Sequence, residues 1–189
     1  MEKLTGLKKI KTAVFISGTG SNLKNLIKFS KIKKTPISVN LVISSNVKAK
    51  GLRYADQFNI KKKIFSFQNI KNVEKNILIL LHNEKIHFIC LAGFMKILSK
   101  NFIKKFNGKI INIHPSLLPK YKGLNTHQRA IVNRDKFAGC TVHYVTEKLD
   151  SGKIVMKKRI KVTAKDDSAS LAKKVLKQEL KLYPAAIMK

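Results

Sequence analysis

Apolar runs alternate along the chain with segments in which apolar residues recur at helical spacing. Residues 12–17 read TAVFIS and residues 37–44 read ISVNLVIS, and such runs are typical of buried strands. Between them, from Ser21 onward, apolar residues recur at i, i+3 and i+4, which predicts a helix. A strand, a helix and a second strand in this order favour a βαβ unit, so the pattern predicts an α/β fold with a largely parallel sheet.

The same pattern continues to the end of the chain. Further strands are expected at residues 64–67, 87–92, 110–113, 139–146 and 153–162, and further helices at residues 70–81, 99–106, 126–133 and 171–182. Residues 114–124 hold two prolines and a glycine, so this stretch is expected to be a long loop. In parallel sheets ligands bind at the carboxyl ends of strands, which directs attention to the loops after residues 17, 92 and 113.

The first of these loops reads Ser-Gly-Thr-Gly-Ser-Asn over residues 17–22 and opens a predicted helix. Glycines let a ligand approach backbone N–H groups closely, and a helix N-terminus attracts anions. Ser21 or Asn22 could cap the helix or donate to a phosphate. The loop has neither the third glycine of the dinucleotide fingerprint nor a Gly-Lys-Ser/Thr ending. A phosphate site and a plain strand–helix turn both remain open.

The third loop begins with Asn112, Ile113, His114 and Pro115 at the end of a predicted strand. Side chains two residues apart on a strand leave the same face, so Asn112 and His114 can reach one oxygen together. An amide and an imidazole suit a carbonyl that becomes an oxyanion, and the imidazole can later pass on a proton. The alternative is a turn-forming Asn beside a structural His.

The turn after residue 146 contains a carboxylate that could act together with Asn112 and His114. Asp150 lies in Leu149-Asp150-Ser151-Gly152, between two predicted strands. It either takes part in ordinary turn chemistry or orients His114 and assists proton transfer. His127 and His143 could support the site, but their spacing does not show it. Cys90 and Cys140 have no nearby ligand partner, so no metal site is expected.

Composition bounds the class of protein. The chain has 189 residues, of which 44% are hydrophobic, and this favours a single globular domain over residues 1–189. Its halves, at about residues 1–110 and 111–189, would hold the phosphate loop and the catalytic loop respectively. No apolar run is long enough to span a bilayer, and Met1–Lys11 lacks the apolar core of a secretory signal. Two cysteines in apolar runs predict buried free thiols, and the cytoplasm is the expected location.

The charge is extreme, with 40 Lys and Arg against 10 Asp and Glu and a formal net charge of +30. A nucleic-acid surface would explain it. However, only four of the 40 are arginines, and the lysines are spread along the whole chain. Nucleic-acid surfaces usually mix in Arg, so a drift of composition is the favoured interpretation and nucleic acid is not an expected partner. The field would still attract an anionic small substrate.

Four blocks together resemble one enzyme family. VFISGTGSNLKNLI, LAGFMKILS, INIHPSLLPKYKGLNTHQRAI and GCTVHYVTEKLDSGKIV are similar, in order and spacing, to folate-dependent phosphoribosylglycinamide formyltransferases. The resemblance covers most of residues 12–184 and implies a formyltransferase fold, which is a mixed, mostly parallel sheet flanked by helices. It implies transfer of a formyl group from 10-formyltetrahydrofolate to the amine of 5′-phosphoribosylglycinamide, without a metal. The oligomeric state stays open between monomer and homodimer.

The resemblance also implies roles for individual residues. Asn112, His114 and Asp150 match the catalytic residues of the family. The residues that match its ribonucleotide site are Gly18, Thr19, Gly20, Ser21, Asn22, Pro115 and Glu179. The residues that match its folate pocket are Met95, Lys96, Ile97, Leu98, Val145 and Thr146.

Three alternatives compete with this interpretation. A methionyl-tRNA formyltransferase shares the HPSLLP block, but it needs a further tRNA-binding domain for which 189 residues leave no room. A basic nucleic-acid-binding α/β module would give the positive charge a purpose. A catalytically idle homologue is disfavoured by the presence of Asn112, His114 and Asp150.

Overall fold

The computed structural model describes residues 9–189, so most of the segment Met1–Lys11 lies outside the described residues. The chain divides into two compact units. The first comprises the described residues up to Lys96 with residues 106–109 and Met188, and the second comprises residues 97–105 and 110–187 with Lys189. The single-domain organisation expected from the length stays a prediction.

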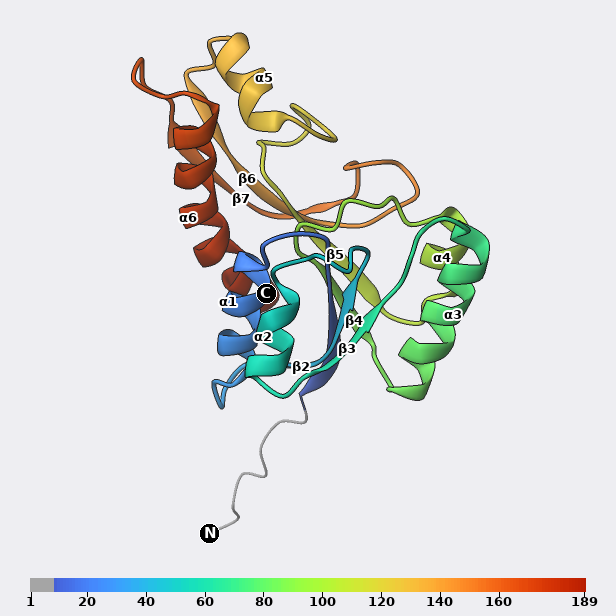
Figure 1. The fold of residues 1–189 in the computed structure, drawn as a ribbon. Coiled ribbons are helices and arrows are strands. Elements are labelled where there is room, and N and C mark those ends of the chain that lie inside the picture. Colours follow the sequence, from blue (N-terminus) through green and yellow to red (C-terminus); the bar gives the residue numbers. More distant parts are fainter. Residues whose placement is uncertain (1–8) are drawn as a thin grey trace. The chain divides into compact units, whose positions relative to one another are not determined.

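The first unit is built on parallel strands. Its strands, in the order β3-β2-β1-β4, are β1 (Ile10–Ile16), β2 (Ile37–Ser44), β3 (Lys61–Ile64) and β4 (Phe88–Leu91). All three pairings among them are parallel. Its helices are α1 (Ser21–Ser30), α2 (Leu52–Gln57) and α3 (Ile70–Asn83). Helices α1 and α2 cover one side of these strands and α3 covers the other (Figure 1). The βαβ pattern predicted from the sequence is confirmed.

The core of the first unit lies on both faces of its central strand. Residues 13–16 of β1 are fully buried, as expected for a strand covered by helices on both sides. Leu23, Leu26 and Ile27 of α1 are also fully buried, and they are the residues whose spacing predicted this helix. This packing fixes the carboxyl end of β1 and therefore the position of the loop at residues 17–20.

One prediction for this unit is wrong, and one helix was missed. The short third strand lies at Lys61–Ile64 and not at 64–67, because it pairs with β2 through the backbone while its lysines are exposed. Exposed lysines are common on edge strands and leave no apolar alternation in the sequence. Helix α2 was not predicted, since it has only 6 residues and buries only Leu52 and Ala55.

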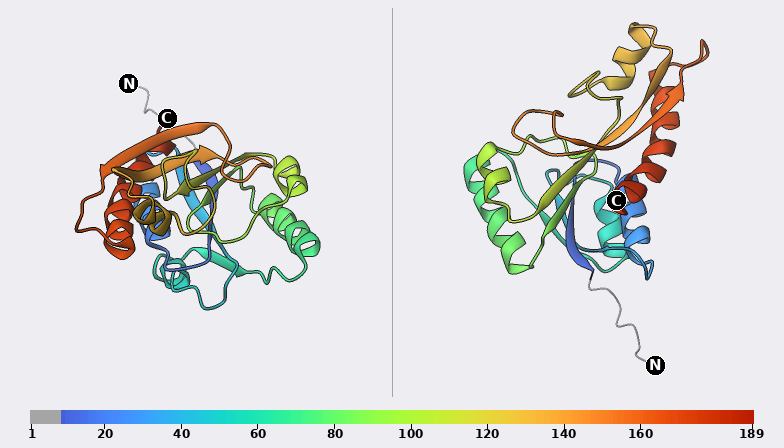
Figure 2. Two further views of the ribbon diagram at one scale, coloured as in Figure 1. Left: turned by 90° about the horizontal axis from the view of Figure 1, so that it is seen from above. Right: turned by 180° about the vertical axis from the view of Figure 1, so that it is seen from behind.

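The second unit carries antiparallel strands. Its strands are β5 (Lys109–His114, whose first residue belongs to the first unit), β6 (Phe137–Tyr144) and β7 (Ile154–Lys161), and both pairings among them are antiparallel. Its helices are α4 (Lys100–Lys105), α5 (Thr126–Val132) and α6 (Ser168–Ile187). Helix α6 packs along β6 and β7 (Figure 2). The sheet therefore has parallel and antiparallel pairings, which confirms the mixed sheet flanked by helices that the resemblance implies.

Helix α6 closes the core of the second unit. Leu171, Val175 and Tyr183 are fully buried, and the Tyr183 hydroxyl donates to the Ile111 carbonyl oxygen at 3.2 Å. Cys140 of β6 is buried and free, and burial raises the pKa of its thiol to about 12. These contacts fix β5 and β6, the strands that carry the polar residues described below. No helix within residues 9–189 combines the length and the apolarity needed to cross a bilayer.

Candidate active site

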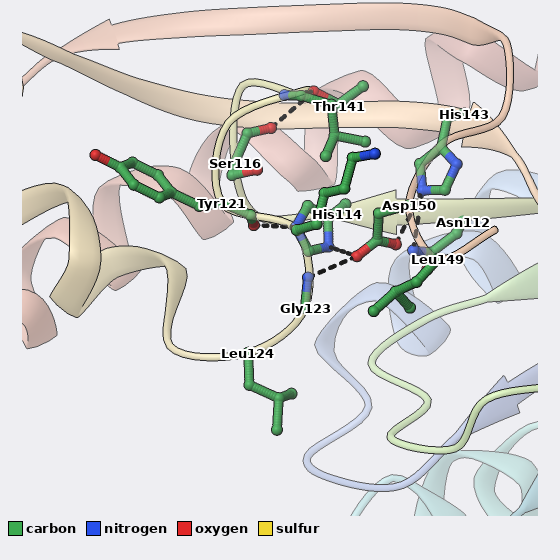
Figure 3. A network of polar contacts seen from close by, with 12 residues as sticks. Asn112, His114, Ser116, Tyr121, Gly123, Leu124, Thr141, His143, Leu149 and Asp150 are labelled. Carbon is green, nitrogen blue, oxygen red and sulfur yellow. Dashed lines mark hydrogen bonds and ion pairs between the residues drawn. The ribbon is translucent and has the colours of Figure 1, made fainter.

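Strand β5 ends with the two polar side chains singled out in the sequence. Asn112 lies opposite His143 of β6, and His114 lies opposite Thr141. Figure 3 shows both β5 side chains beside Asp150, as expected for residues two apart on a strand. The structure thus brings Asn112, His114 and Asp150 into one cluster within the second unit.

The imidazole of His114 is held from both ends. Its Nε2 atom lies 2.8 Å from the carbonyl oxygen of Tyr121, which can only accept, so Nε2 carries a hydrogen. Its Nδ1 atom lies 3.4 Å from Oδ2 of Asp150, and the two side chains are only 6% and 7% exposed. Burial lowers the pKa of His114, although the Tyr121 carbonyl and the Asp150 charge oppose this. The ring is therefore neutral at pH 7, with a lone pair on Nδ1 facing the carboxylate.

Asp150 is placed by a tight turn between β6 and β7. Its own φ is +44°, and its Oδ2 atom accepts a hydrogen bond from the Gly123 N–H at 2.8 Å. Two residues later, a Cβ on Gly152 would lie 1.8 Å from the Tyr144 carbonyl oxygen, so the turn can close only around glycine. Burial alone would raise the pKa of Asp150. Contacts with His143, with the Gly123 N–H and with His114 outweigh burial and lower the pKa, so the carboxylate stays ionised.

His143 links Asn112 to Asp150. Its Nδ1 atom lies 2.9 Å from the Tyr144 carbonyl oxygen and so carries a hydrogen. Its Nε2 atom lies 3.2 Å from Nδ2 of Asn112 and 3.5 Å from Oδ1 of Asp150. A neutral ring accepts from the Asn112 amide through Nε2, and a protonated ring would donate to Asp150. The sequence did not single out His143 because only the β5–β6 register places it opposite Asn112.

The loop after His114 is fastened to β6. The Thr141 side chain lies beside Ser116 (Figure 3). Its hydroxyl donates to the Ser116 carbonyl oxygen at 2.7 Å and accepts from the Leu118 N–H at 3.1 Å. The Ser116 hydroxyl in turn donates to the Lys120 carbonyl oxygen at 2.6 Å. These bonds hold the chain on both sides of Pro119 and lead it to Tyr121, whose carbonyl oxygen accepts from His114.

In the first unit, the glycine loop after β1 is clamped by the segment after β2. A Cβ on Gly20, whose φ is +78°, would lie 2.5 Å from the Cα of Gly51. A Cβ on Gly51 would lie 2.8 Å from the Ile16 side chain, so both positions require glycine. The Gly51 N–H donates to the Gly18 carbonyl oxygen at 3.0 Å. The backbone of the loop is therefore rigid at the start of α1.

Ser17 ties three strand-end segments of the first unit together. Its N–H donates to the Gly93 carbonyl oxygen at 3.0 Å, and its hydroxyl oxygen accepts from the Met95 N–H at 2.8 Å. The same hydroxyl shares a 2.6 Å hydrogen bond with the Ser45 hydroxyl, and the Ser17 carbonyl oxygen accepts from the Asn46 amide at 3.3 Å. The loops after β1, β2 and β4 thus share one polar centre.

One expectation for the glycine loop is wrong. Helix α1 begins at Ser21, and the residue before it, Gly20, has no side chain with which to cap the helix. Neither Ser21 nor Asn22 therefore serves as the cap that the sequence suggested. Of the residues assigned to the ribonucleotide, Gly18 and Thr19 are placed in the turn between β1 and α1. A helix N-terminus without a side-chain cap keeps backbone N–H groups available to an anion.

The residues assigned to the folate differ in exposure. In the first unit Met95 is 62% exposed, and in the second unit Ile97 is 67% exposed whereas Leu98 is buried. Lys96 is exposed, and Phe94 beside it packs edge-on against Phe15 at 5.3 Å between ring centroids. Exposed apolar side chains on an anchored segment suit a flat organic ligand.

The remaining assigned residues also lie in the second unit. Val145 is half-buried and Thr146 is exposed, just after β6. The next residue, Glu147, pairs with Lys100 of α4 at 2.8 Å, which ties this loop to α4. Glu179 of α6 is 8% exposed, and its charge contributes to the raised pKa of Cys140. Within residues 9–189 no three His, Cys, Asp or Glu side chains are grouped so that they could hold a metal ion.

Comparison with known proteins agrees with this geometry. Residues 10–187 match the family model described as formyl transferase. The chain is 41% identical to a phosphoribosylglycinamide formyltransferase of Haemophilus influenzae over 180 residues, which is 94% of this chain and 85% of that protein. It is 40% identical to the human trifunctional purine biosynthetic protein adenosine-3 over 95% of its own length, but it spans only 18% of that protein.

A solved structure gives the same result. The crystal structure of phosphoribosylglycinamide formyltransferase from Brucella melitensis matches with a TM-score of 0.90 and 42% identity, covering 96% of this chain and 95% of that one. The chain therefore belongs to the formyl transferase family, among the phosphoribosylglycinamide formyltransferases.

Proposed function

We propose that this chain transfers the formyl group of 10-formyltetrahydrofolate to the amine of 5′-phosphoribosylglycinamide, as a step in purine synthesis in the cytoplasm. The observation that carries the proposal is the buried cluster of Asn112, His114 and Asp150, in which an amide, a neutral imidazole and an ionised carboxylate converge. Membership of the family supplies the choice of substrates.

The reaction begins when the neutral substrate amine attacks the formyl carbon. Attack converts the formyl carbonyl into an oxyanion and leaves a positive charge on the attacking nitrogen. Asn112 has two amide hydrogens, of which one is directed to Nε2 of His143 and the other remains for the oxyanion. One such donor contributes about 2.7–4 kcal/mol to the stability of the transition state. His143 acts here as a positioning residue, because it fixes which end of the amide faces the site.

His114 moves the proton. Since its Nε2 hydrogen is donated to Tyr121, Nδ1 is the atom that takes the proton from the attacking nitrogen. The imidazolium that forms is paired through Nδ1 with the Asp150 carboxylate at 3.4 Å, which stabilises its charge. When the bond from carbon to N10 of the folate breaks, the same proton passes to N10. The amine becomes a formamide and the folate leaves as tetrahydrofolate, so atoms and charges balance.

The glycine loop of the first unit would hold the phosphate of the ribonucleotide. Gly18, Thr19, Gly20, Ser21 and Asn22 lead into the N-terminus of α1, which favours an anion. The close approach of Gly20 to Gly51 keeps this backbone rigid. Pro115 and Glu179 are assigned to the same substrate on the resemblance alone.

The folate would rest on the segments that follow β4 and β6. The assigned side chains are Met95, Lys96, Ile97, Leu98, Val145 and Thr146. Exposed Met95 and Ile97 suit the flat face of a pterin, and Lys96 suits a carboxylate. The folate is a cosubstrate and not a resident cofactor, because it leaves after each turnover.

The proposal is tested by mixing the purified chain with synthetic 5′-phosphoribosylglycinamide and 10-formyltetrahydrofolate and following release of tetrahydrofolate by absorbance. Release should require the ribonucleotide, and the product should carry the formyl group on its amine. The matched control is glycinamide riboside, which lacks the phosphate and should raise KM strongly. A second control is methionyl-tRNA, and its formylation in place of the ribonucleotide would overturn the proposal.

A further inference from the structure

Arg129 of α5 reaches back over the loop that precedes its own helix. Its Nη1 atom donates to the Lys122 carbonyl oxygen at 2.7 Å and lies 3.5 Å from the Leu124 carbonyl oxygen. Its guanidinium carbon lies 4.9 Å from the centroid of the Tyr121 ring. One side chain therefore touches three residues of the loop 121–124.

This loop supplies two backbone contacts to the polar cluster. The Tyr121 carbonyl accepts from His114, and the Gly123 N–H donates to Asp150. The contacts of Arg129 fall on Tyr121 and on both neighbours of Gly123, so they flank the two backbone groups. Fixing these groups fixes the direction of the imidazole and of the carboxylate.

The backbone of the loop needs such support. Tyr121 and Asn125 have φ values of +55° and +57°, and Gly123 between them has φ of +76°. The left-handed region is unfavourable for a tyrosine, and it persists only where surrounding contacts hold it. The Tyr121 ring is held by the Arg129 guanidinium and its hydroxyl accepts from the Asn133 amide at 3.0 Å, both from the α5 side.

Several charged or titratable groups act on His114. Asp150 approaches from the turn after β6, His143 from β6 itself, and His127 and Arg129 from α5. Burial is the main cause that lowers the pKa of His114. The Tyr121 carbonyl and Asp150 raise it, and the positive charge of Arg129 adds to the lowering. Removing this charge should raise the pKa of His114 slightly.

We propose that Arg129 is a positioning residue for formyl transfer, which clamps the loop 121–124 so that its backbone orients His114 and Asp150. The clamp needs arginine because a planar guanidinium can stack on an aromatic ring while it donates to neighbouring carbonyls, whereas a lysine ammonium cannot do both. The consequence for kcat rests on the function proposed above. The consequence for the loop does not depend on it.

Two variants of Arg129 separate the effect of its contacts with the loop from the effect of its positive charge. Arg129→Lys keeps the charge and loses the stacked fork, and Arg129→Gln loses both. Arg134→Lys and Arg134→Gln are matched controls, because Arg134 is an exposed arginine just after α5. Each variant is checked for an unchanged melting temperature and far-UV spectrum before kinetics, so that a fall in activity is not a failure to fold.

Three readouts are taken on all variants: amide exchange, steady-state kinetics and the pH profile of kcat/KM. Amide hydrogen exchange at Gly123, measured by NMR, should be roughly tenfold faster in both Arg129 variants than in wild type, because one charged hydrogen bond and the stacking are lost. Steady-state kinetics should show kcat lower by a similar factor, with both KM values within about twofold of wild type. The acidic limb of the kcat/KM profile should move to higher pH in Arg129→Gln, because the charge that lowers the pKa of His114 is lost. It should not move in Arg129→Lys, which keeps the charge.

The results can show separately whether the Arg129 clamp or the proposed formyl transfer is wrong. Wild-type exchange at Gly123 in Arg129→Lys overturns the clamp, whether or not the chain is active. Wild-type kcat in Arg129→Lys overturns its role in formyl transfer. If wild-type protein shows no turnover while Gly123 exchange responds only to the Arg129 variants, the proposed function fails and the clamp stands.

Discussion

The Nδ1 atom of His114 lies 3.4 Å from Oδ2 of Asp150, with both side chains more than nine-tenths buried. The pKa of each group is lowered, so at neutral pH a neutral imidazole faces an ionised carboxylate. Such a pair is prepared to take up one proton at Nδ1, and a substrate amine that has just attacked a carbonyl has one to give.

Replacing Asp150 with Asn should lower kcat about 10²–10⁴-fold, because the imidazolium formed during transfer loses its compensating charge. The amide can still accept from the Gly123 N–H, so the turn should keep its shape. Stopped-flow and steady-state assays measure the loss. Asp135→Asn is the control, since Asp135 pairs with Lys120 and not with the cluster. Equal activity of Asp150→Asn and Asp135→Asn would show that the carboxylate has no part in catalysis.

Replacing Asn112 with Ala should lower kcat about 10²–10³-fold, through loss of an oxyanion donor. KM for both substrates should change much less, because the donor acts on charge that develops in the transition state. His143→Gln should give a smaller fall in kcat, because it removes no oxyanion donor but frees the Asn112 amide to rotate and loosens one contact of Asp150. A loss confined to KM in Asn112→Ala would assign this residue to substrate binding.

Gly20→Ala should destabilise the fold by about 2 kcal/mol or more, because the residue has positive φ and the new Cβ would collide with Gly51. Gly18→Ala should leave the free energy of unfolding nearly unchanged, since a Cβ there has no atom within 4 Å. Urea denaturation of the two variants gives the comparison. If the variants unfold alike, the close approach of the two segments is not what fixes the loop.

The free energy of unfolding should fall as the pH drops below 6.5. His114 has a folded-state pKa below its ordinary value of 6.5, mainly because of burial, so the unfolded chain binds the proton more tightly. The loss should accumulate from about pH 6.5 down to the folded-state pKa and then cease for this group. His127 has a pKa lowered by burial in the same direction. His114→Gln and His127→Gln should each flatten the slope of unfolding free energy against pH, and an unchanged slope in both would contradict these shifts.

Much of the fold could be predicted from the sequence because buried strands and amphipathic helices leave periodic apolar patterns. The pattern at Leu23, Leu26 and Ile27 predicted α1, and the continuous run at residues 37–44 predicted β2 with the bounds that the structure gives. The pattern fails where backbone pairing alone makes the element. The lysines of β3 point to solvent, so nothing in their order indicated a strand.

Some residues of the candidate site could likewise be predicted from the sequence, and others could not. Asn112 and His114 could be found because they stand two apart on one strand, but their link to His143 depends on the register of β5 against β6. Arg129 and Ser17 act on backbone groups of loops, and loop geometry leaves no periodic trace in a sequence. Residues whose side chains bind backbone groups of loops can therefore be identified only from the structure.

The central claim is that His114 carries the proton during formyl transfer. Single-turnover transfer of a ¹³C-labelled formyl group to the ribonucleotide, followed by NMR in wild type and in His114→Ala, tests it most directly. We expect labelled formamide in the wild type and a rate lower by about 10²–10⁴-fold in the variant, with the fold intact. Transfer at the wild-type rate in His114→Ala would contradict it.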